Sequence, residues 1–117
     1  MSAWPVELRV DAGRSVLKVA FEGGASFTLP AEYLRVESPS AEVQGHSAAQ
    51  KHTVTGKRHV KIISVEPVGN YAARIIFDDG HDTGLYSWDY LHELGRDQNA
   101  KWSAYLSALC KSGGRRE

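Results

Sequence analysis

Histidines have the widest chemical range of the residues in this 117-residue chain, because imidazole both binds metals and exchanges protons near neutral pH. There are five of them: His46, His52, His59, His81 and His92. None has the His-Glu-x-x-His spacing of a zinc protease helix. His46, His52 and His81 could still surround a metal if the long loop that carries the first two folds back. The alternative is that these side chains are solvated or hydrogen-bonded.

A second candidate for chemistry is the segment LRVESPSAEVQGH, in which Ser38-Pro39-Ser40 stands where a metal loop would hold cysteines. A structural zinc site needs four ligands, usually thiolates and imidazoles. Serine hydroxyls stay protonated near neutral pH and are weak zinc ligands, and Cys110 is the single cysteine of the chain. We therefore expect no structural zinc and no other cofactor.

The sequence lacks the residue patterns that mark common enzymes. It has no Gly-x-Ser-x-Gly element, no phosphate-binding loop, and no His-x-Asp or His-x-Glu pair of the kind used by non-heme iron sites. Cys110 falls near the end of a helical segment, where the helix dipole disfavours a thiolate. We expect a protein without enzymatic activity. One enzymatic reading stays open, in which the irregular residues 37–58 form a lid over an active site.

Three aromatic residues, Tyr86, Trp88 and Tyr90, follow shortly after the polar pair His81-Asp82. Tryptophan and tyrosine dominate the hot spots of protein interfaces, so these five residues are candidates for an interaction face. In a small domain the same side chains commonly pack helices onto a sheet. The sequence leaves both readings open.

Composition limits the class of partner and the compartment. Fourteen basic and fourteen acidic residues give no net charge, so a nucleic-acid partner is not expected. No apolar run approaches the roughly 20 residues that cross a membrane, and the N-terminus lacks a signal peptide. A single cysteine suits a reducing compartment. We expect a cytoplasmic protein whose partner is another protein or a second copy of this chain.

Hydrophobic periodicity predicts one α+β domain over residues 1–111, with a flexible tail at 112–117. Six runs alternate as strands do: 6–10, 16–21, 25–29, 60–65, 71–77 and 82–86. Glycine-containing pairs predict tight turns between most of them: Ala12-Gly13, Gly23-Gly24, Gly69-Asn70 and Asp79-Gly80, the last favouring type I′. The predicted architecture is an antiparallel β-meander sheet with short helices packed on one face.

Three helical segments complete the pattern. Pro30 ends strand pairing and begins a short helix over residues 31–36. Ser87 is a typical N-cap for a helix over 88–94, and Gly95 suits the position just after its end. Asp97 can cap a C-terminal helix over residues 98–111, whose apolar side chains recur at helical spacing.

The run EPVGNYAARIIFDDGHDTGLYSWDYLHELG, residues 66–95, resembles the signature of the gamma-butyrobetaine hydroxylase-like N-terminal domain family. The segments LRVESPSAEVQGH and TGKRHVKIISVEPVGNY are similar to stand-alone bacterial members, a domain of unknown function. The resemblance extends over residues 6–94. The family name does not imply hydroxylase activity for this chain, because its sequence contains no residue expected to carry out hydroxylation.

The resemblance also implies the position of a zinc site and the kinds of protein with which such a domain occurs. In gamma-butyrobetaine and trimethyllysine hydroxylases such a domain precedes the iron-dependent catalytic domain and binds zinc through a Cys-x-Cys-x-x-Cys cluster and a later histidine. The cysteine positions fall here on Ser38, Ser40 and Val43, and the histidine on His81. With three of the four ligands absent, the site is degenerate. Similar domains are fused to P-loop iron–sulfur carriers, which implies an accessory role near iron–sulfur or oxygenase partners.

Overall fold

The computed structural model describes residues 4–40 and 53–117. Two three-stranded antiparallel sheets form this part of the chain. The first contains β1 (Pro5–Val10), β2 (Val16–Phe21) and β3 (Ser26–Pro30). The second contains β4 (Ile62–Val68), β5 (Ala72–Phe77) and β6 (Leu85–Ser87). The described helices are α1 (Ala31–Val36), α3 (Trp88–Arg96) and α4 (Gln98–Ser112).

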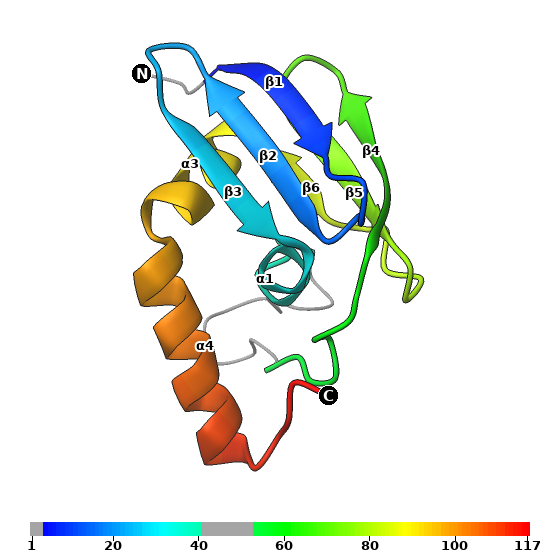
Figure 1. Ribbon diagram of the computed structural model, residues 1–117, viewed down its shortest axis with the longest axis vertical. Helices are drawn as coiled ribbons and strands as arrows, with labels where there is room; N and C mark the ends of the chain where they lie inside the picture. The colour runs from blue at the N-terminus through cyan, green and yellow to red at the C-terminus, as the bar shows by residue number, and fades with distance from the viewer. Residues whose placement is uncertain (1–3, 41–52) are drawn as a thin grey trace.

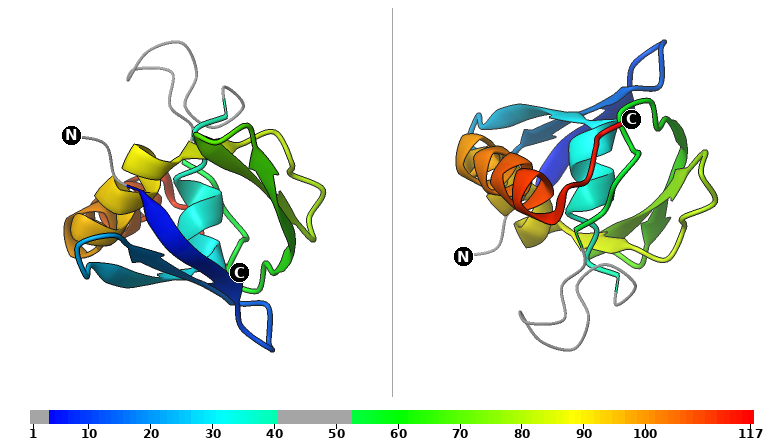
Figure 2. Two further views of the ribbon diagram at one scale, coloured as in Figure 1. Left: turned by 90° about the horizontal axis from the view of Figure 1, so that it is seen from above. Right: turned by 90° about the horizontal axis from the view of Figure 1, so that it is seen from below.

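The predicted α+β class is confirmed, with the strands divided between two sheets instead of forming one. Helix α1 lies between the sheets, and α3 and α4 lie to one side, where α3 packs against β3 (Figures 1 and 2). Five of the six residues of α1 are buried. No described helix is long and apolar enough to cross a membrane.

The inward faces of both sheets and the helices form the main core. Its fully buried members alternate along the strands, as the sequence pattern predicted. They include Leu17, Val19, Leu29, Ile62, Ile75 and Phe77 from the sheets, and Leu34, Leu91 and Leu94 from the helices. A smaller cluster of Val36, Tyr105 and Leu109 packs α4 beneath α1. Helix α1 is therefore in contact with both clusters, which fixes the position of the segment that follows it.

The turn after β5 differs from the predicted two-residue type I′ turn. The amide of Gly80 donates to the carbonyl of Phe77 (3.2 Å), and the amide of Phe77 donates to the carbonyl of His81 (3.0 Å). Gly80 has φ +90°, whereas Asp79 does not share the positive φ that type I′ requires. The turn therefore contains three residues, and the extra residue directs the side chains of Asp79 and His81 toward α1.

Two other backbone predictions are also corrected. The predicted β1–β2 turn at Ala12-Gly13 has its positive φ at Arg14, which donates from its side chain to the carbonyl of Ile63 (2.7 Å). Asp97 precedes α4 but makes no side-chain cap; its carboxylate pairs with Arg96 (2.9 Å). By contrast, the predicted Ser87 cap is confirmed, because its hydroxyl accepts from the amide of Tyr90 (3.1 Å).

From its residue type, Gly95 is predicted to lie just after the end of helix α3. In the structure Gly95 lies inside this helix. A Cβ atom at this position would stand 2.2 Å from Cγ of Phe27. Phe27 belongs to β3, and with Phe21 it also packs edge-on against the ring of His92. The glycine therefore allows α3 to approach the sheet closely, which a helix-end interpretation misses.

Replacing Gly95 by alanine tests this close approach. In an ordinary helix interior the change stabilises by about 1 kcal/mol, because alanine has the higher helix propensity. Here we expect a loss of about 1–3 kcal/mol from overpacking against Phe27. Urea denaturation gives the free energy of unfolding. Gly13→Ala is the matched control, since its Cβ would meet nothing nearer than 3.5 Å. A Gly95→Ala variant more stable than the wild type would contradict the interpretation.

Candidate functional site

The structure brings Ser38 and His81 together. Ser38 follows helix α1, and His81 follows the turn after β5, 43 positions later. Ser38 Oγ and His81 Nε2 share a hydrogen bond of 2.9 Å, whose donor depends on the histidine tautomer. Both residues are buried, with exposed fractions of 0% and 6%. The two are thus direct neighbours in the interior.

Ser40 extends the same cluster. Its amide donates to Ser38 Oγ (3.3 Å), and its hydroxyl shares a hydrogen bond with Thr83 Oγ1 (2.8 Å). A Cβ atom at Gly84 would stand 2.5 Å from Ser38 Oγ. Residue 84 is therefore glycine because the loop after His81 passes directly over the serine hydroxyl. The serine segment and the loop 81–84 fit closely against one another.

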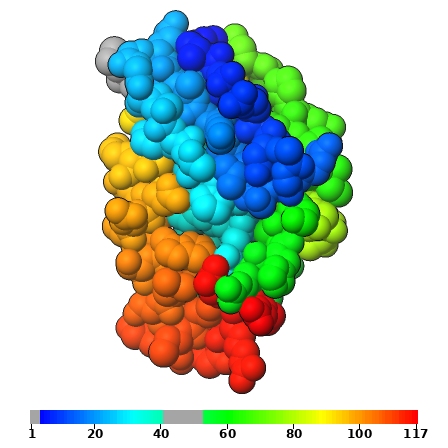
Figure 3. Space-filling view, viewed as in Figure 1, coloured from blue at the N-terminus to red at the C-terminus, as the bar shows by residue number. Residues whose placement is uncertain are grey.

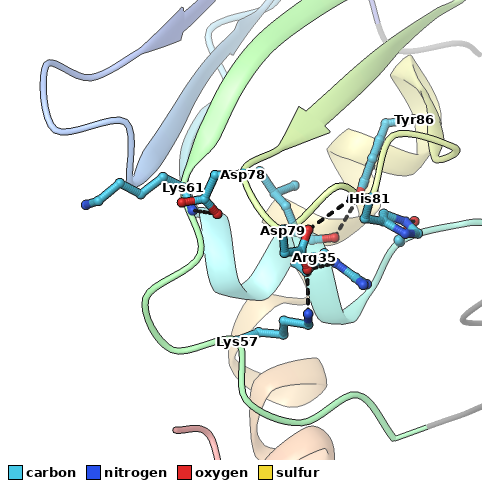
Figure 4. A network of polar contacts seen from close by, with 9 residues as sticks. Arg35, Lys57, Lys61, Asp78, Asp79, His81 and Tyr86 are labelled. Carbon is cyan, nitrogen blue, oxygen red and sulfur yellow. Dashed lines mark hydrogen bonds and ion pairs between the residues drawn. The ribbon is translucent and has the colours of Figure 1, made fainter.

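Asp79 connects this cluster to two cations (Figure 4). Its carboxylate accepts from Arg35 Nε (2.9 Å), pairs with Lys57 Nζ (2.5 Å) and accepts from the amide of His81 (3.1 Å). Burial acts to raise the pKa of Asp79, but the hydrogen bonds from Lys57, His81 and Arg35 outweigh it and lower the pKa to about 2. The carboxylate therefore holds three chain segments together while charged.

Arg35 retains an unused donor. Its side chain is 12% exposed, and Nη1 is a buried nitrogen without a hydrogen bond in the structure. The cluster thus holds two cations, one carboxylate and a histidine, with serine and threonine hydroxyls beside them. The residues that the structure describes contain no group of three or more His, Cys, Asp or Glu side chains arranged to hold a metal.

Two of the candidate interaction residues, Tyr86 and Tyr90, make hydrogen bonds within the domain. Tyr86 is fully buried and donates to the carbonyl of Leu34 (2.5 Å), and Tyr90 donates to the carbonyl of Glu37 (2.5 Å). Burial, the largest influence, raises the pKa of both phenols. In this conformation Tyr86 cannot contact a partner. Of the two interpretations left open by the sequence, packing in the core applies to this residue.

The remaining members of that group reach the surface in part. Trp88 is half-buried, packs against the core and donates from its ring nitrogen to the carbonyl of Asn70 (2.8 Å). Asp82 lies 3.9 Å from Arg74, with half of its side chain exposed. Val43, His46 and His52 lie outside the described residues, so a metal site of His81 with His46 and His52 stays a prediction.

The nearest carboxylate on the same turn as His81 has a structural role. Asp79 accepts from the backbone amide of His81, so this contact positions the main chain of the turn and not the imidazole ring. Ser38 has no exposed surface through which a substrate could reach its hydroxyl. The cluster is therefore built to hold the chain together in this conformation.

Comparison with known proteins identifies the family. Residues 8–92 match the family described as gamma-butyrobetaine hydroxylase-like, N-terminal, so the chain belongs to this family. No curated protein matches the chain.

Solved structures agree with this assignment. One, determined by NMR in solution, is 41% identical with a TM-score of 0.87, covering 100% of this chain and 92% of that one. A second NMR structure is 44% identical with a TM-score of 0.85, covering 99% and 86%. A crystal structure from Acidithiobacillus ferrooxidans, described as a DUF971-family protein of unknown function, is 41% identical with a TM-score of 0.64, covering 78% and 91%.

The geometry bears on the degenerate zinc positions that the resemblance implied. Ser38, Ser40 and His81 are three of those four positions, and they lie together in one hydrogen-bonded cluster. The fourth, Val43, is outside the described residues. Sequence reasoning missed the partners that complete the cluster, Asp79, Arg35, Lys57 and Thr83. The signal that could have located Asp79 is the Asp78-Asp79-Gly80-His81 order at the turn, read as a three-residue loop.

Asp79→Asn tests the charged hub. A carboxylate with a depressed pKa stabilises the folded state above the unfolded pKa of about 3.9 and loses this contribution as pH falls to about 2. We expect Asp79→Asn to lower the free energy of unfolding by about 1 kcal/mol at pH 6, because partial solvent contact screens the pairs. The difference from wild type should vanish near pH 2. Urea denaturation across this range measures it.

Asp82→Asn is the matched control, since Asp82 is on the same loop, carries the same charge and is more exposed. It should change stability by less than about 0.5 kcal/mol at either pH. A difference between wild type and Asp79→Asn that is constant from pH 6 to pH 2 would contradict a role for the charge.

A second prediction concerns the degenerate positions. Ser38→Cys, Ser40→Cys and Val43→Cys together restore the three thiolates that the family resemblance groups with His81, and tetrahedral zinc binds such a set. We expect the triple variant to hold about one zinc per chain and to lose it on further His81→Ala substitution. Elemental analysis of untagged protein measures the content. A triple variant without zinc would show that the positions are not arranged as ligands.

The untagged wild type is the control in this experiment. We expect sub-stoichiometric metal in it, because hydroxyls replace thiolates. Stoichiometric metal in the wild type that disappears in His81→Ala would instead support the alternative site of His81 with His46 and His52.

Proposed function

We propose that this protein is a non-enzymatic accessory domain that binds a protein partner through the outer face of the β4–β5–β6 sheet. The observation that carries the proposal is the exposure of Leu85, an apolar side chain with 43% of its surface accessible on that face. No described helix or strand lies over this side of the sheet (Figure 2). Ile63 at the bulge of β4 and Tyr71 at the β4–β5 turn are also more than half exposed.

The strand register places Leu85 beside charges that are paired with one another. Leu85 pairs with Arg74, which in turn pairs with Glu66, so the three side chains lie across one face of the sheet. Arg74 is bonded to Glu66 (2.7 Å) and lies 3.9 Å from Asp82. The positive charge of Arg74 is therefore balanced locally. Such a face favours an apolar protein surface over a highly charged partner such as nucleic acid.

The context of the proposal comes from the family. Its description names the N-terminal part of a hydroxylase-like protein. The resemblance also extends to domains fused to iron–sulfur carriers. We therefore propose partners among iron–sulfur or oxygenase proteins of the cytoplasm. The buried Ser38–His81 cluster supports a non-catalytic role, because it offers no accessible nucleophile.

Leu85→Glu tests the face. The new carboxylate would stand opposite Arg74 and form a cross-strand pair, so the fold should persist while the apolar surface becomes charged. We expect the variant to lose the proteins that the wild type retains from native lysate, with binding weakened at least tenfold for a purified partner. Quantitative mass spectrometry of the retained proteins and a thermal melt of each variant are the measurements.

Val6→Glu is the matched control, because Val6 is 63% exposed but belongs to the other sheet, on strand β1. It should retain the same proteins as the wild type. Loss of binding in both variants, or in neither, would count against this face. Sedimentation at several concentrations distinguishes the remaining outcome, in which a second copy of the chain occupies the face and Leu85→Glu abolishes the dimer.

A further inference from the structure

A buried carboxylate on α1 is held by an arginine from the segment that follows α4. Glu32, in the first turn of α1, is 7% exposed. Arg116 donates to it twice, from Nε (2.9 Å) and from Nη2 (2.7 Å). The planar guanidinium and the carboxylate thus meet edge to edge, the geometry that distinguishes arginine from lysine.

The same guanidinium lies over an aromatic ring. Arg116 Cζ stands 5.3 Å from the ring centroid of Trp102, within the range of a cation–π contact. Trp102 is itself held by Tyr33, edge-on at 6.2 Å, and by Tyr105 at 5.2 Å. A fixed indole face and a fixed carboxylate therefore converge on one cation.

A cavity of about 240 Å³ adjoins this contact. Its walls are Pro30, Glu32, Tyr33, Gln98, Trp102 and Arg116. Glu32 and Trp102 both contact the guanidinium of Arg116, which forms part of the cavity wall, and the cavity leaves open space beside that group. A charged group and an aromatic wall that converge on one point are features of a site for a small cationic group.

The segment that carries Arg116 is also attached to the residues before β4. Figure 3 shows the C-terminal residues between α4 and the segment that begins at residue 53. The carbonyls of Arg115 and Arg116 accept from the amides of Gly56 (2.9 Å) and Arg58 (2.8 Å). The Arg58–Glu117 pair is largely exposed, and such pairs contribute little. The predicted flexibility of residues 112–117 stays a prediction, but these contacts show where the tail docks.

We propose that the Glu32–Trp102 pocket is a binding site for the guanidinium group of an arginine side chain from a partner protein, and that Arg116 occupies it in the absence of that partner. The chain's own arginine acts as an intramolecular competitor. An incoming arginine would displace the tail and release residues 56–58 from their two backbone hydrogen bonds. This pocket is separate from the β4–β5–β6 face, so either proposal can fail without the other.

The experiment removes the side chain of Arg116 and adds a small molecule that carries the same guanidinium group. N-acetylarginine amide is titrated into the full-length Arg116→Ala variant, and the ring N–H signal of Trp102 is followed by NMR. We expect a saturable shift with millimolar affinity in Arg116→Ala, and at least tenfold weaker binding in the wild type, where Arg116 competes. N-acetylcitrulline amide has nearly the same shape without the charge and should give no saturable shift.

Two variants make the result specific. Glu32→Gln combined with Arg116→Ala should abolish binding, because the carboxylate is lost. Arg58→Ala is the matched control: it removes a neighbouring arginine contact but leaves Arg116 in place, so it should behave as the wild type. If Arg116→Ala proves too unstable for NMR, Arg116→Gln keeps a donor to Glu32, and the probe should raise its melting temperature but not that of Glu32→Gln.

The proposal is overturned by any of three results. These are no saturable response in Arg116→Ala or in Arg116→Gln, an equal response when Glu32 is replaced, or equal responses to the arginine and citrulline probes.

Discussion

Burial of the short helix α1 between two sheets is the constraint on which the other features depend. A helix leaves its last four carbonyls without intrahelical partners, and a buried carbonyl without a hydrogen bond costs about 1–3 kcal/mol. Tyr86 and Tyr90 supply donors to the carbonyls of Leu34 and Glu37. In the other direction, Tyr33 of α1 donates to the carbonyl of Leu94 at the end of α3 (2.7 Å). Three tyrosine hydroxyls therefore fix α1 against β6 and α3, and with it the chain that continues to Ser38.

Charges at the two ends of α1 organise the segments outside the sheets. Glu32 in its first turn holds Arg116, and Arg35 in its last turn holds Asp79 with Lys57. The segments that carry Arg116 and Lys57 are bonded to each other through the amides at 56 and 58. Contiguous contacts therefore connect the two ends of α1. Removing one partner of such a partly buried pair leaves a charge that must be solvated again.

The sequence predicts much of the local structure because strand alternation and helix caps are short-range effects. The strands over 16–21 and the helix over 31–36 have the predicted bounds, and Ser87 caps α3 as its residue type indicates. Some failures are local: Asp97 makes no side-chain cap, and the turn at Asp79-Gly80 contains three residues. Other failures are long-range. Gly95 is set by Phe27, which is 68 positions earlier, and Gly84 by Ser38, so no local pattern reveals why either is glycine. Asp79 and Lys57 likewise come from separate segments, the turn after β5 and the residues before β4, and no local pattern indicates their contact.

Residue type did not indicate which of the aromatic residues lie at the surface of this fold. Tyrosines that read as an interaction face from composition are needed inside, because a buried helix end requires donors that are also apolar. Likewise Ser38 and His81 meet where a metal site would lie, yet their hydroxyl and imidazole bond to each other. This hydrogen bond joins the segment after α1 directly to the turn after β5. The two surfaces that we propose for recognition lie elsewhere: the outer face of the β4–β5–β6 sheet and the pocket that Arg116 lines.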